Sequence, residues 1–141
     1  MRAIATLLVV TLLAGCGAAK ESAMPAALTL ADFAGNWQMS TTLTGTPDPI
    51  AATMTGTADA ASWTMTLTGR PNVALQVSIV GDSLITQTAE YESILRAGVM
   101  VSVRSAGVMK DGALSGNTVA TYKTPAGEEQ VTGTFTATKM M

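Results

Sequence analysis

The chain has 141 residues, a single cysteine and no histidine, and its formal charge is −2. Without histidine it lacks the usual general base near neutral pH and the commonest ligand of zinc and copper, which excludes Ser-His-Asp and Cys-His catalysis. A mildly acidic chain also lacks the basic surface that nucleic-acid binding requires. We therefore expect a protein that is not an enzyme, that carries no metal or cofactor, and that does not bind nucleic acid.

The first 15 residues have the pattern of an export signal. Met1-Arg2 supplies a positive start, and an apolar run extends from Ala3 to Ala14. The run is shorter than the roughly 20 residues that span a bilayer. It matches the apolar region of a signal peptide, which small residues follow at the cleavage point. We predict that residues 1–15 are a signal peptide.

Leu13-Ala14-Gly15-Cys16 resembles the lipobox of bacterial lipoproteins. The resemblance implies cleavage before Cys16 and acylation of its thiol, so that the membrane is a partner through this lipid. Gly17 follows the cysteine, where an Asp would indicate retention in the inner membrane of many Gram-negative bacteria. The expected location is therefore the cell envelope, at the outer membrane and facing the periplasm.

Residues 16–30 are expected to form the lipidated end and a short tether. This stretch is small and polar at first, and Pro25 interrupts it. Thr29-x-x-Asp32 has the spacing of a capping box and predicts one helical turn. Phe33 would then close one end of the domain that follows.

Strict alternation of apolar and polar residues dominates the rest of the chain. β-branched residues are frequent in it, which is typical of half-buried antiparallel strands. Rows of threonine form the expected outer face, because a β-branched polar residue suits a solvated strand. The clearest stretches are residues 36–43, 62–68, 73–79, 99–104 and 131–138.

Seven breaks interrupt this alternation, at residues 45–49, 59–61, 69–72, 81–82, 95–98, 111–112 and 125–127. Gly81-Asp82 and Asp111-Gly112 are strong signals for two-residue hairpins. Seven connections imply eight strands, and no stretch offers the long helix that a parallel crossover needs. We predict an all-β domain over residues 31–141, an eight-stranded antiparallel up-and-down barrel. A two-sheet sandwich is the alternative.

Gly35-Asn36-Trp37, at the start of the first strand, resembles the corresponding Gly-x-Trp of lipocalin and other calycin barrels. The resemblance implies that Trp37 packs across the closed end of the barrel, against a basic residue of the last strand. Lys139 occupies that place here, where an arginine is more usual. A closer likeness is to uncharacterised bacterial lipoproteins, through the patterns of residues 69–71, 91–96 and 98–99; these bring no known activity.

Glu90 and Glu92 form the densest acidic pair. Two carboxylates on one face of a strand could perform acid–base catalysis if burial raised the pKa of one of them. The alternative, which we favour, is an exposed strand end where a glutamate forms an ion pair with Arg96.

The candidate ligand-binding residues are Trp37, Met39, Met65, Tyr91, Arg96, Arg104 and Tyr122. The methionines would line an apolar pocket or fill gaps in a core poor in aromatic residues. Arg104 would need an anionic partner if it pointed inward, but the better core row of Val99, Val101 and Val103 places it outward. Small residues at Gly116, Ala120, Gly133 and Ala137 would leave room if they faced inward.

Two functions follow from these observations. The barrel would bind a small apolar or amphipathic molecule if its centre is hollow. It would instead be a structural or protein-interaction module of the cell envelope if its core is solid. An eight-stranded barrel permits either arrangement.

Overall fold

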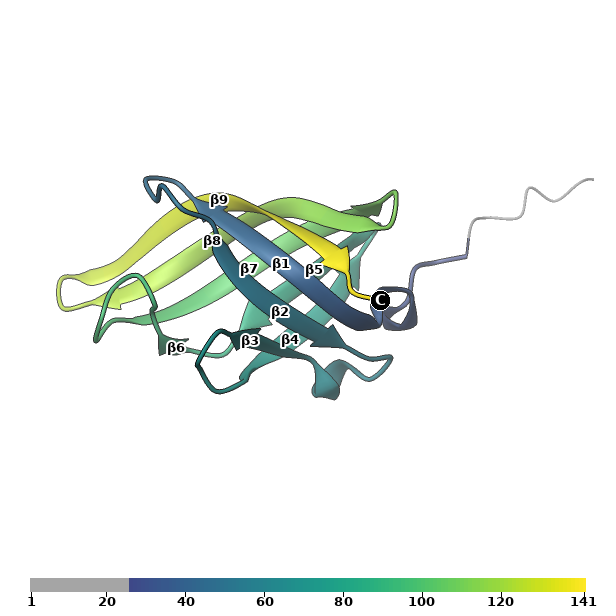
Figure 1. The fold of residues 1–141 in the computed structure, drawn as a ribbon, viewed down its shortest axis with the longest axis horizontal. Helices are drawn as coiled ribbons and strands as arrows, with labels where there is room; N and C mark the ends of the chain where they lie inside the picture. The colour runs from purple at the N-terminus through teal and green to yellow at the C-terminus, as the bar shows by residue number, and fades with distance from the viewer. Residues whose placement is uncertain (1–25) are drawn as a thin grey trace, which may run out of the picture.

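The computed structural model describes residues 26–141, and over these residues the chain forms a closed, eight-stranded antiparallel barrel (Figure 1). The predicted signal peptide and Cys16 lie outside the described residues. Two short 3-10 helices accompany the strands, η1 (Leu30–Phe33) and η2 (Ala60–Ser62). Among the described residues, no helix is long and apolar enough to cross a membrane. The strands are β1 (Gly35–Leu43), β2 (Ile50–Gly56), β3 (Thr64–Leu67), β4 (Val73–Val80), β5 (Ser83–Thr88), β6 (Tyr91–Glu92), β7 (Met100–Lys110), β8 (Ala113–Thr124) and β9 (Gly127–Lys139).

Neighbouring strands in the chain are neighbours in the barrel. β1 pairs with both β2 and β9, and β5 pairs with β7 to close the ring. β6 is a two-residue addition that pairs only with the start of β7. The closed ring confirms the predicted barrel and excludes the two-sheet sandwich.

Two tight hairpins lie where glycine-containing pairs predict them. Asp111 and Gly112 both have positive φ angles, 53° and 77°, as a type I′ turn requires. Gly81 has a φ of 62° in the turn between β4 and β5. These turns match the twist of the flanking strands and therefore help to set their register.

The predicted alternation sets which side chains face the interior. On β1, Trp37, Met39 and Leu43 are buried and their neighbours Asn36, Gln38 and Ser40 are not. The outer surface carries the predicted threonine rows, most fully on β9. The interior is mainly aliphatic and methionine-rich, and its buried aromatic residues are Phe33, Trp37, Trp63, Tyr122 and Phe135.

One end of the barrel is plugged by aromatic residues. Phe33 of η1 is fully buried, and the indole Nε1 of Trp37 donates a hydrogen bond to its carbonyl oxygen at 2.9 Å. The ammonium of Lys139 lies 5.5 Å from the centre of the Trp37 ring, within the range of a cation–π contact. Asp32 accepts the backbone N–H of Thr29 at 2.7 Å, which fixes the start of η1. The expected closed-end packing of Phe33, Trp37 and Lys139 is confirmed.

The fifth strand ends earlier than the sequence suggests. The alternation places its break at residues 95–98, but β5 ends at Thr88 and β6 begins at Tyr91. The Oγ1 of Thr88 accepts the backbone N–H of Val103 at 2.8 Å. Ala89 donates its own N–H to the carbonyl of Ala74. The first bond replaces a backbone acceptor of β5 with a side chain, and the second is the last bond between this segment and β4. The chain then crosses the open end, and we call residues 90–98 the strap.

Candidate functional site

A cavity occupies the half of the barrel away from the aromatic plug. Its volume is about 50 Å³, which is room for a few water molecules. All eight barrel strands except β9 contribute to the wall, and the strap contributes the cover. The lining residues are Met39, Thr41, Leu43, Ile50, Ala52, Met54, Met65, Leu67, Leu75, Thr86, Thr88, Tyr91, Ser93, Ile94, Leu95, Val101, Val103, Ser105, Ala120 and Tyr122.

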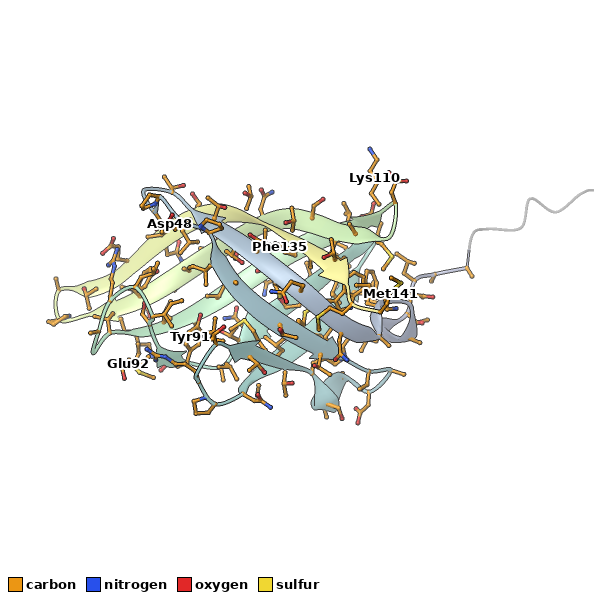
Figure 2. The ribbon with its side chains drawn as sticks, in the orientation of Figure 1. Asp48, Tyr91, Glu92, Lys110, Phe135 and Met141 are labelled. Carbon is orange, nitrogen blue, oxygen red and sulfur yellow. The ribbon has the colours of Figure 1, made fainter. Side chains whose placement is uncertain are left out.

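The strap forms the boundary between this cavity and solvent. Ile94 and Leu95 line the cavity and are each 43% exposed, so they have one side in the barrel and one side in water. Tyr91 points into the cavity from β6, and Figure 2 shows it beside Glu92, far from Lys110 and Met141 at the plugged end. A molecule entering from the open end therefore meets the strap first.

Polar contacts fasten the strap to three other elements. The guanidinium of Arg96 makes two hydrogen bonds to the carboxylate of Glu129 on β9, at 2.8 and 2.9 Å. The same guanidinium lies 4.2 Å above the ring of Tyr122. Glu90 forms an ion pair with Lys123 of β8. On the opposite side of the mouth, Arg70 donates a hydrogen bond to the Glu92 carbonyl at 2.9 Å.

The pKa values around the mouth follow from these contacts. Burial raises the pKa of the Tyr91 hydroxyl to about 12, and the nearby Tyr122 adds to this, while Arg70 opposes it. The hydrogen bonds from Arg96 lower the pKa of Glu129 and raise that of Arg96 itself. The contact with Glu90 raises the pKa of Lys123. At neutral pH, Tyr91 is thus an uncharged hydrogen-bond donor and both ion pairs are charged.

The structure brings four of the seven candidate ligand-binding residues together. Met39, Met65, Tyr91 and Tyr122 all line the cavity, although they come from four different strands. The other three do not line it.

Trp37 lies in the plug at the closed end, where it is part of the packed core. Arg96 lies over the rim, paired with Glu129. Arg104 is exposed on the outer face of β7, because Val103 and Ser105 take the inward positions. The surface position that the alternation favours for Arg104 is therefore the observed one.

The acidic pair has no catalytic geometry. Glu90 and Glu92 are both exposed, and Glu92 accepts the backbone N–H of Gly98 at 3.0 Å. The ion pairs differ from the expected local one, because Glu90 pairs with Lys123, and Arg96 pairs with Glu129, 33 residues away. Closure of the barrel brings these distant residues together.

The small residues of the last two strands leave little room in the barrel. Among them only Ala120 lines the cavity. A side chain on Gly116 would collide with the backbone of Ala106, and one on Gly133 would collide with the carbonyl of Thr42. These glycines therefore permit neighbouring strands to approach closely, and they open no space.

The alternation along the chain did not predict a set of hydroxyl groups that point into the cavity. Thr86, Thr88, Ser93 and Ser105 line the cavity, while the predicted threonine rows face outward. The only local signal is parity, since Thr86 and Thr88 alternate with Ile85 and Gln87 on β5. That signal does not say which of two mixed faces is buried.

Within residues 26–141, no group of three or more acidic or cysteine side chains is placed to hold a metal ion. Comparison of the chain with protein-family models, with curated proteins and with solved structures finds no match. The cavity is therefore the feature on which a functional proposal rests.

Proposed function

We propose that this chain is a lipid-anchored lipoprotein of the bacterial cell envelope whose barrel holds a small apolar or amphipathic molecule. The observation that carries the binding proposal is the cavity between the aromatic plug and the strap. It is concave, mostly apolar and lined by a few polar groups, which is the usual character of small-molecule sites. The anchoring part rests on the resemblance of residues 13–16 to a lipobox.

The make-up of the wall supports binding of more than water. Met54 and Met65 are direct partners across β2 and β3, and Met39 lies on the neighbouring β1. Methionine side chains adapt their shape to what they pack against. The flexibility of the methionines, under a cover of the partly exposed Ile94 and Leu95, would allow a cavity of about 50 Å³ to enlarge around a slender molecule.

One observation favours the alternative of a structural or protein-interaction module. The cavity is small compared with the roughly 300–1,000 Å³ of typical ligand pockets. In that case Ile94 and Leu95, which are partly exposed, would serve contacts with other proteins.

A matched pair of variants on β2 separates the two functions. Ala52→Leu fills the cavity from the inner face, whereas Ala51→Leu adds the same atoms to the exposed outer face. We expect native mass spectrometry of the wild type and Ala51→Leu to show a small molecule that co-purifies, and Ala52→Leu to lack it. Ala120→Leu provides a second filled cavity from β8, and circular dichroism checks that each variant is folded.

Loss of the bound mass from Ala51→Leu as well as Ala52→Leu would contradict binding in the barrel. A wild-type protein that carries no small molecule, and that gains no thermal stability from any uncharged apolar compound, would favour the structural module.

A further inference from the structure

The wall of the cavity has two chemically different sides. The side formed by β1–β4 is apolar apart from Thr41. The side formed by β5–β8 and the strap carries the other hydroxyl groups, those of Thr86, Thr88, Tyr91, Ser93, Ser105 and Tyr122. A bound molecule therefore meets hydrocarbon on one flank and hydroxyl groups on the other.

Several of these hydroxyls are left with a proton to donate. The Oγ of Ser93 accepts the backbone N–H groups of Leu95 and Arg96, at 3.1 and 3.2 Å, which occupies both of its lone pairs. The Oγ1 of Thr88 accepts the N–H of Val103. The Tyr91 hydroxyl is protonated at neutral pH. Ser105 already shares its hydroxyl with Thr118 at 2.8 Å, but Thr88, Tyr91 and Ser93 each keep a proton that an acceptor oxygen of a bound molecule can take.

Charge is missing from the same wall. Among the described residues that line the cavity, none carries a carboxylate, an ammonium or a guanidinium group. The nearest cation on the strap, Arg96, is held by two hydrogen bonds to Glu129 at the rim. An ionised molecule would lose its hydration on entering the cavity and would find no opposite charge there, which is costly in an apolar site.

We propose that the molecule held in the barrel is uncharged, with a slender apolar body against β1–β4 and an acceptor oxygen, such as that of a ketone, ester or ether, toward β5–β8. This inference rests on the proposed binding function and specifies its ligand class. It assigns the recognition of the ligand to hydroxyl groups, with Tyr91 at the entrance, and leaves the arginines Arg96 and Arg104 outside it.

Four compounds of matched chain length test the ligand class. They are 2-heptanone, which is an uncharged acceptor; heptane, which has no acceptor; hexanoate, an anion; and hexylammonium, a cation. The protein carries Cys16→Ser, so that no acyl chain competes for the cavity. Chemical shifts of the methionine methyl groups report binding, and we expect 2-heptanone to bind at least threefold more tightly than heptane and the two ions to cause no shift of Met39 or Met65.

Removing single hydroxyls tests the polar flank. Tyr91→Phe and Thr86→Val each delete one cavity hydroxyl with little change of shape, and Thr136→Val makes the same threonine change on the outer face of β9. We expect each cavity variant to weaken 2-heptanone binding about 3–10-fold, as one lost hydrogen bond does. Heptane binding should be unaffected, and Thr136→Val should behave as the parent.

The outcomes distinguish the two proposals. If none of the four compounds binds, the binding function itself fails. If hexanoate or hexylammonium binds as tightly as 2-heptanone, binding stands and the uncharged class is wrong. If heptane matches 2-heptanone, or the hydroxyl deletions leave its affinity unchanged, the donor flank plays no part.

Discussion

Trp37 links the N-terminal and C-terminal segments of the folded domain. Its indole donates to the carbonyl of Phe33 in η1, and its ring lies under the ammonium of Lys139 at the end of β9. Trp37 and Lys139 are also direct partners in the β1–β9 ladder. The residue therefore stabilises the plug by burial, by a hydrogen bond and by a cation–π contact at once.

We expect Trp37→Ala to lower the free energy of unfolding by about 3–5 kcal/mol, because the ring is almost fully buried and its removal leaves a cavity. Denaturant unfolding followed by circular dichroism measures this change. Gln38→Ala, at the next and exposed position of β1, is the control and should unfold at the parent midpoint. An unchanged midpoint for Trp37→Ala would exclude its role as the plug.

At the scale of elements, the strap is held largely outside the strand ladders. Only Tyr91 and Glu92 belong to a ladder, and the polar contacts of the strap with β8 and β9 are two ion pairs and the cation–π contact of Arg96 with Tyr122. Exposed ion pairs contribute little to global stability and are screened by salt. They are nevertheless what holds the strap against β8 and β9.

Acid should release the Arg96–Glu129 contact. Arg96 lowers the pKa of Glu129 from 4.5, so the pair is complete above that pH and is lost as the pH falls through the lowered value. We expect the backbone chemical shifts of Leu95 and Arg96 to titrate with a midpoint below pH 4.5. Glu129→Gln should abolish this titration, and Glu128→Gln, the neighbouring change, should preserve it.

If the Leu95 and Arg96 chemical shifts titrate equally in Glu129→Gln and Glu128→Gln, Glu129 is not the contact that holds the strap. Salt provides a second check, because raising the ionic strength at neutral pH should shift the wild-type signals toward those of Glu129→Gln.

At the scale of the whole molecule, the two ends of the barrel differ in role. The described chain enters at the plugged end through η1 and also finishes there after β9 (Figure 1). The strap and the cavity mouth lie at the other end. A lipid on Cys16 would therefore be connected to the domain at its plugged end.

We expect Cys16→Ser to release the protein from the membrane fraction, or to leave it unprocessed, since no acyl chain can be attached. Two or more acyl chains are needed for stable anchoring. Fractionation of cells and the intact mass of the protein measure the outcome. A variant that stays in the membrane with the mass of the mature wild type would refute the lipoprotein proposal.

Local sequence was sufficient to predict the strands, and it favoured a barrel over a two-sheet sandwich. The period of two of a strand is visible in alternating residues such as Trp37, Met39 and Leu43, and pairs such as Asp111-Gly112 specify their turns. These signals need no knowledge of distant contacts, so the eight barrel strands and their antiparallel pairing were predicted. Met39, Met65 and Tyr91 were among the candidate ligand-binding residues, and the structure places all three in the cavity wall.

Tertiary structure decided the rest, because it depends on which strands meet. Pairing of β5 with β7 puts the hydroxyls of Thr88 and Ser105 on one flank of the cavity, and closure brings Arg96 to Glu129. The early end of β5 at Thr88 depends on a bond to Val103, 15 residues further along the chain. The sequence by itself determined the strands, their turns and their antiparallel order, whereas closure into a barrel and the chemistry of its cavity were set by contacts between residues far apart in the chain.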